Sequence, residues 1–367
     1  MKIGITTFQY AHNYGALLQL VAMVRILKEL GHQPEAINYI PPEAKPLPFW
    51  KGWGLKQGDL RNNISKRLIR FKHEDVIAQK FSDFIESNVS LSEPCYTPEE
   101  VGNIANNYDA IITGSDQVWR FDNSQVYFLE FNKPYQGKRI SYAPSCGELN
   151  QTESRKKNVG QWLSSFDNIS VRDNISAQVV FNAIGSKPSI VADPTLLGGL
   201  KDLAIKVPDI PDRYIFMYVL GKEIDGGHNE MIETIRNYYG EIPVVALVAS
   251  MHKPQNFGWA DHTVWDAGPG EWLYLVSKSS FVYTDSYHCS LFSIKEKKPF
   301  VSYYAEEKRA PRLIDMKERY QVTKSVASSV TNACDLEFWK QEYNPDIEKS
   351  ISEHINFSLG FLKNALN

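Results

Sequence analysis

Hydrophobic and polar positions follow two periods along the chain, and each period predicts one kind of element. Short runs of aliphatic and aromatic residues are typical of buried strands and recur from residue 2 onward. Between them, apolar residues return every three to four positions, as on the helical face that residues 16–30 build from Leu17, Leu20, Val21, Val24 and Leu27. Strands that alternate with helices predict an α/β protein with parallel sheets covered on both faces.

The first half of the chain forms one such α/β unit. Its strands are predicted at residues 2–8, 33–40, 110–113, 139–144, 169–172 and 189–192. A stretch rich in Pro, Trp and Gly (41–58), followed by a basic helical pattern (62–87), interrupts the alternation. We therefore predict an N-terminal domain over residues 1–200 that carries an insertion at about residues 41–98.

A second α/β unit begins near residue 213. Glycines and prolines in residues 198–212 favour an interdomain linker. The strands that follow are predicted at residues 214–220, 244–248, 281–283 and 300–304, and the helices at residues 229–239, 271–278 and 289–297. We predict a C-terminal domain over residues 210–335, a helical segment over residues 336–367, and a cleft between the two sheets.

Length and composition are consistent with two cores. The chain has 367 residues, 43% of them hydrophobic, and a net charge of −3 that gives no reason to expect nucleic acid as a partner. The longest aliphatic run, residues 243–249, is too short to span a bilayer, and no secretory signal is recognisable, so we expect a cytoplasmic protein. The four cysteines form no C-x-x-C pair, which argues against a zinc knuckle or a disulfide framework.

Polar residues cluster where predicted strands end, at residues 9–15, 114–119, 172–173 and 285–288. Open α/β sheets bind ligands at this edge, and His288 lies there, between a strand and the next helix. Residues 13–15 precede a helix, so their backbone N–H groups are suited to face an anion or simply to begin that helix. Because neither G-x-G-x-x-G nor a Walker loop is present, no specific motif indicates a nucleotide.

Seven segments resemble, in order and spacing, the polysaccharide pyruvyl transferase family. They are GITTFQYAHNYGALLQL (4–20), YDAIITGSDQVWR (108–120), YFLEF (127–131), RISYAPSCG (139–147), ISVRD (169–173), ADPTLL (192–197) and TDSYHCSLFSIKEKKPFV (284–301). The resemblance implies a GT-B-like fold, in which two Rossmann-like domains face a central cleft. The N-terminal domain is then expected on the acceptor side, and the C-terminal domain, which carries His288, on the donor side.

The resemblance also implies a reaction. A pyruvyl group passes from phosphoenolpyruvate to a sugar of a polysaccharide precursor, a pyruvate ketal forms, and phosphate is released without any further cofactor. The product is expected to enter capsule, exopolysaccharide or cell-wall glycans that are built on the cytoplasmic side, so the glycan acceptor is expected to be lipid-linked.

Ketal formation requires a proton at the vinyl carbon of the donor and attack by a sugar hydroxyl. Histidine suits such proton transfers because its unperturbed pKa is roughly 6.5. The family's active-site histidine matches His288, which we expect to be the general acid. Asp116 is expected to act as a base, to bind the sugar or to cap a helix, and these three interpretations stay open. Gln117, Asn13 and Tyr14 are expected on the acceptor side.

Phosphoenolpyruvate carries a phosphate and a carboxylate, so its site needs cations with directional donors. Arg172 matches the family's donor-binding arginine, and a guanidinium can bind either group through two hydrogen bonds; the alternative is a surface ion pair with Asp173. Lys308 lies where the family places a basic residue that contacts the phosphate, with Arg309 and Arg312 close enough to take the same role.

The chain departs from the family pattern next to its histidine. Many relatives have an arginine and a hydrophobic residue there, where this chain has Ser286 and Tyr287. We keep Ser286 among the donor-binding residues and expect a basic contact at this place to be absent or supplied by another residue. No metal is expected, because no His, Cys and carboxylate cluster with ligand spacing accompanies His288.

The basic insertion helix allows two interpretations. Its cations are Lys66, Arg67, Arg70 and Lys72. We favour a surface helix packed on the first domain over peripheral contact with the inner face of an anionic membrane.

Two alternatives to the pyruvyl transferase also stay open. One is a GT-B glycosyltransferase that uses a nucleotide sugar, and the other is a catalytically silent relative that binds a glycan or phosphate.

Overall fold

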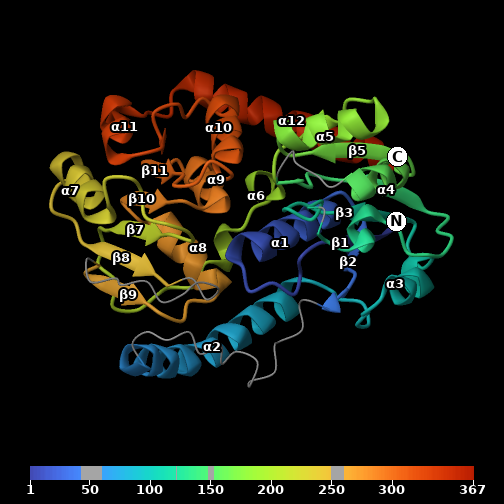
Figure 1. Ribbon diagram of the computed structural model, residues 1–367, viewed down its shortest axis with the longest axis horizontal. Helices are drawn as coiled ribbons and strands as arrows, with labels where there is room; N and C mark the ends of the chain where they lie inside the picture. Colours follow the sequence, from blue (N-terminus) through green and yellow to red (C-terminus); the bar gives the residue numbers. More distant parts are fainter. Residues whose placement is uncertain (43–59, 121, 148–152, 249–259) are drawn as a thin grey trace.

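The computed structural model describes residues 1–42, 60–120, 122–147, 153–248 and 260–367, with the side chains of helices α2 and α4 described from residues 73 and 158 onward. Within these ranges the strands form two six-stranded sheets in which all neighbouring strands are parallel. Helices alternate with the strands, so the fold is α/β as predicted. Figure 1 shows the two sheets in separate halves of the molecule.

The first sheet lies in the N-terminal half. Its strands are β1 (Lys2–Thr6), β2 (Gln33–Ala36), β3 (Ala110–Thr113), β4 (Lys138–Ser141), β5 (Asn168–Val171) and β6 (Ser189–Ile190), in the order β2-β1-β3-β4-β5-β6. The helices of this half are α1 (Tyr14–Glu29), α2 (Leu60–Asn88), α3 (Pro98–Ala105), α4 (Glu153–Leu163), α5 (Asn174–Ile184) and α6 (Pro194–Leu197), with a 3₁₀ turn η3 (Gln125–Phe128). Each predicted strand of this half exists, although most are shorter than the apolar runs because the runs continue into buried loops.

The second sheet is built in the same way. Its strands are β7 (Ile215–Tyr218), β8 (Val244–Leu247), β9 (His262–Val264), β10 (Phe281–Thr284), β11 (Phe300–Tyr303) and β12 (Val326–Ala327), in the order β12-β11-β10-β7-β8-β9. The helices are α7 (His228–Tyr239), α8 (Pro269–Lys278), α9 (Tyr287–Lys295), α10 (Ala310–Arg319), α11 (Val330–Asp335) and α12 (Pro345–Leu366), with 3₁₀ turns η4 (Lys201–Leu203) and η5 (Phe338–Lys340). The central strands β7, β8, β10 and β11 are buried at every residue, as parallel strands covered on both faces should be.

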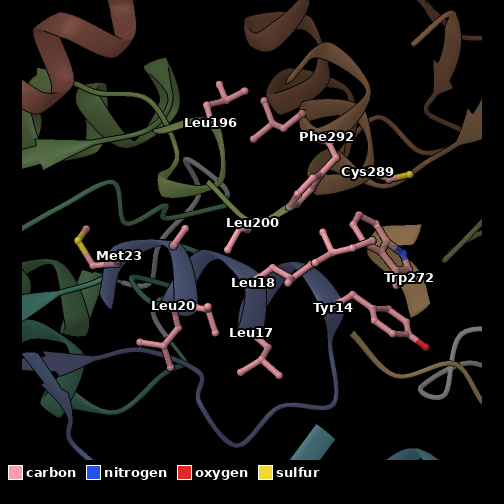
Figure 2. Packing of buried hydrophobic residues seen from close by; sticks show 14 of the residues in the cluster. Tyr14, Leu17, Leu18, Leu20, Met23, Leu196, Leu200, Trp272, Cys289 and Phe292 are labelled. Atoms are coloured by element: carbon pink, nitrogen blue, oxygen red, sulfur yellow. The ribbon is translucent and has the colours of Figure 1, made fainter. Parts of the chain in front are cut away.

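One apolar core joins the two halves. Helix α1 is buried around most of its circumference because it packs on the first sheet and also meets α8 of the second half. Figure 2 shows Leu17 and Leu18 of α1 in the same cluster as Trp272 and Phe292. Since this cluster is continuous across the two halves, the fold holds them in a fixed relation.

Two helices contact both halves. Helix α12 follows the second sheet in sequence but returns to the first, where the Ser358 hydroxyl accepts from the Ala192 backbone N–H at 2.8 Å. Helix α2 buries Ile77 and Phe81, and its Lys80 forms an ion pair with Glu271 of α8 at 2.6 Å.

These contacts agree with a packed surface helix for the insertion. Its four cations lie where side chains are outside the description, so membrane contact stays a prediction. None of the described helices combines the length and the apolar character that crossing a bilayer requires.

Candidate functional site

A cavity of about 450 Å³ lies between the two halves, at the carboxyl ends of central strands. Its walls are formed by Asn13, Asp116, Gln117, Arg120, Gly147, Leu220, Asp285, Ser286, Tyr287, His288, Lys308, Arg309, Arg312 and Leu313. The first sheet contributes the residues that follow β1, β3 and β4, and the second contributes those that follow β7, β10 and β11. Among the predicted site residues, Arg172 and Tyr14 do not line this cavity.

Two helices begin at the cavity wall. Asn13 precedes α1 and its side-chain oxygen accepts from the Ala16 N–H at 3.1 Å, while Ser286 precedes α9 and accepts from the Cys289 N–H at 3.4 Å. Each cap leaves other first-turn N–H groups without an intrahelical partner. The positive ends of both helix dipoles therefore face the same space and favour an anion there.

Glycine at position 15 lets the two helices meet. A β-carbon on Gly15 would lie 2.1 Å from Nδ1 of His288, much closer than any real contact. The first turn of α1 therefore lies directly against the imidazole.

Tyr14, the preceding residue, is turned into the interdomain core. Its ring stacks on Trp272 with centroids 5.8 Å apart, and its hydroxyl donates to the Ala267 carbonyl at 2.8 Å. The structure thus places Tyr14 in the packing between the two halves and not at the cavity surface, where we had expected it to bind the acceptor.

His288 is the second residue of α9, and only 8% of its surface is exposed. Its Nε2 lies 3.5 Å from Oδ2 of Asp193 and 3.4 Å from Nη1 of Arg172. One ring nitrogen therefore faces both an acceptor and a donor. The helix start, the glycine contact and these two partners fix the ring at the edge of the cavity.

Asp193 is the partner that the sequence interpretation missed. Its Oδ2 also accepts from the Ser115 hydroxyl at 2.7 Å and from Arg172 Nη1 at 3.0 Å, and its Oδ1 accepts from the Thr195 N–H at the start of α6. Burial alone raises the pKa of Asp193, but His288, Arg172 and Ser115 outweigh it and hold the pKa well below its ordinary value. An Asp-Pro pair at the end of a predicted strand was the available signal, because it marks both a helix start and the ligand edge of the sheet.

Arg172 lies behind His288. It is 2% exposed, forms ion pairs with Asp193 at 3.0 Å and Asp116 at 3.4 Å, and carries its guanidinium 4.7 Å from the centre of the Tyr287 ring. Burial lowers its pKa, yet the nearby carboxylates outweigh this, so the pKa stands above its ordinary value. The alternative of a surface ion pair with Asp173 is wrong, because Arg172 is buried and Asp173 caps α5.

Asp116 lines the cavity in an unusual backbone conformation. Its φ of 85° is uncommon for a residue other than glycine and tends to persist at functional sites. Its Oδ1 accepts from the Gln117 N–H at 2.8 Å, but no helix begins there in the described chain, so the helix-cap interpretation is wrong. Its carboxylate is available as a base or as a ligand for sugar hydroxyls.

Arg312, in the first turn of α10, brings a partly buried cation into the cavity. When the Gln117 amide is oriented with its oxygen toward Arg312, the guanidinium donates to that oxygen. The Nε of Arg312 has no hydrogen-bond partner, and no described carboxylate forms an ion pair with the side chain. Burial, followed by the charge of Arg172, lowers the pKa of Arg312 to about 10. A partly buried guanidinium without an ion pair is suited to bind an anion from outside the chain.

The two other cations of the second half, Arg309 and Lys308, differ in how strongly carboxylates of the chain already bind them. Arg309 forms an ion pair with Asp285 at 2.6 Å, and Asp285 also accepts from the Leu220 N–H at 2.6 Å. Burial raises the pKa of Asp285 although Arg309 opposes this. Lys308 keeps 62% of its side chain exposed and lies 3.8 Å from Glu306, so its ammonium can move toward a ligand at the cavity mouth.

The lining as a whole is cationic. Four Lys and Arg residues face two carboxylates, an excess of two positive charges before His288 is counted. Within the described part of the chain, no group of His, Cys, Asp and Glu side chains is placed to hold a metal ion. The site therefore offers anion-binding groups and one imidazole to a ligand.

Structural comparisons show the fold. A protein assigned as a UDP-N-acetylglucosamine 2-epimerase from Listeria monocytogenes matches with a TM-score of 0.52 and 13% identity, over 100% of this chain and 95% of that one. The UDP-GlcNAc 2-epimerase from Neisseria meningitidis, solved with UDP-GlcNAc bound, matches with a TM-score of 0.51 and 12% identity, over 100% and 99%. At this identity the likeness shows a GT-B-like arrangement of two parallel-sheet domains and nothing of the chemistry.

Sequence comparisons show the family. A search of curated proteins gives no match. A family model described as polysaccharide pyruvyl transferase matches residues 13–306, which is well over half of the chain and includes every residue of the cavity wall except Lys308, Arg309, Arg312 and Leu313. The chain therefore belongs to the polysaccharide pyruvyl transferase family, whose name denotes transferases that act on polysaccharides and implies a glycan acceptor.

Proposed function

We propose that this protein transfers the pyruvyl group of phosphoenolpyruvate to a sugar of a polysaccharide precursor, forming a pyruvate ketal and releasing phosphate. The observation that carries the proposal is that Arg312, a partly buried guanidinium without a described ion pair, lines the same cationic cavity as His288. Phosphoenolpyruvate supplies both things that this pair lacks. It brings anionic groups for the cation and a carbon that must be protonated.

The donor anions fit the second half of the cavity. Arg312 and the start of α9 with Ser286 form its inner part, and the exposed Lys308 stands where it can close over a phosphate. We propose that Arg312 supplies the basic contact that relatives place next to the histidine, where this chain has Ser286. Arg172 then acts indirectly, because its guanidinium is engaged by Asp193 and Asp116 and positions them around His288.

The reaction follows from these positions. His288 gives a proton to C3 of the donor, and the electron deficiency that develops at C2 is met by the oxygen of a first sugar hydroxyl. Asp116, on the acceptor side, takes the proton of that hydroxyl. A second hydroxyl then forms its bond to C2, the bond from C2 to the phosphate oxygen breaks, and the proton of this hydroxyl leaves with the phosphate. Two C–O bonds form and one breaks, which closes the ketal ring.

The acceptor fits the first half of the cavity. Asn13, Asp116 and Gln117 present amide and carboxylate groups that can hydrogen-bond to sugar hydroxyls. These groups come from the first domain and the cations Lys308, Arg309 and Arg312 from the second, so we propose that a sugar held there lies beside the donor. Lipid linkage of the acceptor and a cytoplasmic location remain parts of this proposal.

One experiment tests the donor and the product together. The protein is incubated with phosphoenolpyruvate and a panel of sugars that carry neighbouring free hydroxyls, and both released phosphate and the mass of each sugar are measured. We expect phosphate release that depends on one sugar class, with a matching pyruvyl mass gain on that sugar. Transfer from a nucleotide sugar with phosphoenolpyruvate untouched would replace the proposal with a glycosyltransferase, and the Gln variant of His288 serves as the inactive control.

A further inference from the structure

A second cavity of about 340 Å³ lies away from the catalytic one and shares no lining residue with it. It is formed where the linker between the two halves, with η4, meets the helices α8 and α9. Its volume falls in the range of sites that hold small molecules, roughly 300–1,000 Å³.

The floor of this cavity is apolar. Leu200, Leu273, Val276 and Phe292 contribute to it, and each is at least 95% buried. Figure 2 shows Leu200 and Phe292 in the cluster that joins the two halves of the molecule. The hydrocarbon part of a ligand would therefore rest on side chains whose positions are already fixed by packing, which lowers the entropy cost of binding.

The rim of the same cavity is cationic. Lys201, Lys278 and Lys295 face it, and Glu296 is the one carboxylate of the lining, which leaves an excess of two positive charges. Glu296 is already engaged by Lys201, at 3.0 Å. Burial lowers the pKa of the adjoining Lys298; Glu296 opposes this, and the charges of Lys278 and Lys201 add to it.

Lys295 is held in place beneath this rim. Its ammonium donates to the Thr195 carbonyl at 2.5 Å and also to the Gly198 carbonyl, both in or next to α6. Burial lowers the pKa of Lys295 to about 8, while the charge of Glu296 raises it. An anion at the rim would add to the negative charge that Glu296 supplies.

We propose that this cavity binds an amphipathic anion, a phosphate or carboxylate group on a hydrocarbon chain. The hydrocarbon part lies on the floor of Leu200, Leu273, Val276 and Phe292, and the anionic group lies between Lys201 and Lys278. A soluble metabolite and a lipid headgroup share this chemistry. This proposal does not depend on the donor or acceptor of the catalytic cavity, so it can be tested independently of the proposed reaction.

The binding test uses octyl phosphate as the probe, with inorganic phosphate and octyl glucoside as its anionic and apolar halves. Isothermal titration of the full-length protein is expected to show one site for octyl phosphate that is at least about tenfold tighter than for either half, because both parts of the cavity are then used. Equal affinity for inorganic phosphate, or no binding of octyl phosphate at millimolar concentration, would overturn the proposal.

Variants locate the site. The double variant Lys201→Ala/Lys278→Ala removes two exposed rim lysines and is expected to weaken octyl phosphate roughly tenfold or more. Lys187→Ala/Lys349→Ala is the matched control, since it removes the same charge from exposed positions elsewhere, and it should bind as the unchanged protein does. Arg312→Ala should also leave this binding unchanged, whereas loss of binding in that variant would assign the probe to the catalytic cavity and refute the second site.

An experiment with lipid vesicles distinguishes a soluble anion from a lipid headgroup as the ligand. Sedimentation with phosphatidylcholine vesicles, with and without phosphatidic acid, is compared for the unchanged protein and the double variant. Binding that requires phosphatidic acid and falls in the double variant assigns a lipid headgroup. Octyl phosphate binding without vesicle binding assigns a soluble anion, and vesicle binding that is equal in both proteins is evidence against this cavity as the membrane site.

Discussion

His288 of the second domain lies with its Nε2 3.5 Å from the Asp193 carboxylate of the first domain. The imidazole and the group that orients it therefore come from different halves of the molecule. Gly15, also of the first domain, lies against the other side of the same ring. The catalytic geometry thus depends on how the two domains pack, and the continuous apolar cluster through α1, α8 and α9 is what fixes that packing.

Replacement of the histidine tests its proposed role as acid. His288→Gln keeps a hydrogen-bonding side chain but cannot titrate, so we expect turnover to fall about 10²- to 10⁴-fold while phosphoenolpyruvate still binds. Initial rates of phosphate release and calorimetric titration with the donor measure the two quantities separately. His262→Gln, an exposed position on β9, is the matched control. Turnover near that of the unchanged protein in the His288 variant would leave this residue a binding role at most.

Asp193→Asn tests whether this carboxylate positions the imidazole. We expect kcat to fall with little change in the donor KM, because Asp193 is buried behind His288 and does not line the cavity. The variant leaves Arg172 without its nearer carboxylate, so stability should fall by roughly 3 kcal/mol or more. Asp202→Asn breaks a partly exposed pair with Arg25 and should cost less than about 1 kcal/mol. A change confined to KM would contradict the positioning role.

The loss of stability caused by Asp193→Asn should depend on pH. The folded-state pKa of Asp193 is lowered, so its contribution to stability is fully present above the unfolded pKa of about 3.9 and declines as pH falls toward the lower folded pKa. Urea unfolding of the unchanged protein and of Asp193→Asn at pH 7, 5 and 3 should therefore show a gap that is constant between pH 7 and 5 and smaller at pH 3. If the difference in unfolding free energy between the two proteins grew as the pH fell, the predicted direction of the pH dependence would be wrong.

The sequence specified the sheets better than the site. Fully apolar runs such as those of β3 and β10 predict buried parallel strands by themselves, and the position of His288 after β10 follows directly from them. The directions of the Arg172 and Tyr14 side chains did not follow from the sequence, because both lie at strand or helix ends where a side chain can turn toward the cavity or toward the core. Packing decides between these directions, since Tyr14 meets Trp272 and Arg172 meets Asp193 only after the domains have come together.

The importance of Arg312 could not be predicted from the sequence either. It lies outside the matched part of the chain, and nothing in its local sequence separates it from Arg309 nearby. The two differ in the fold because Asp285 pairs with Arg309, whereas Arg312 has only the Gln117 amide. Helix α4 was likewise not predicted, since the first half of its sequence, ESRKKNVGQWL, has no apolar residue to set a helical period.

Gly15→Ala tests the contact between α1 and the imidazole. The new β-carbon would fall 2.1 Å from Nδ1 of His288, so the ring or the helix must move. Because a displacement of about 1 Å can cost roughly 10²-fold in rate, we expect kcat to fall at least tenfold. Gly199→Ala is the control, since a β-carbon there meets no atom within 4 Å. Equal rates in the two variants would show that the ring position does not limit turnover.

Arg312→Ala tests whether Arg312 contributes to binding of the donor and not to the stability of the fold. If Arg312 binds an anionic group of phosphoenolpyruvate, the donor KM should rise by about 10- to 100-fold, because a charge-assisted hydrogen bond to the donor is lost. Stability should be unchanged or higher, since the substitution removes a partly buried charge that has no described ion pair and is repelled by Arg172.

Arg172→Ala should show the opposite pattern. Its loss strands the carboxylates of Asp193 and Asp116, so we expect lower stability and lower kcat, with donor affinity affected less than in Arg312→Ala. Arg120→Ala, at an exposed wall position paired with Asp122, is the control for simple loss of charge at the cavity. Donor titration and urea unfolding of the three variants decide the assignment. If Arg172→Ala loses donor affinity and Arg312→Ala does not, the donor contact belongs to Arg172, as the family resemblance implied, and the cation at Arg312 must serve the acceptor.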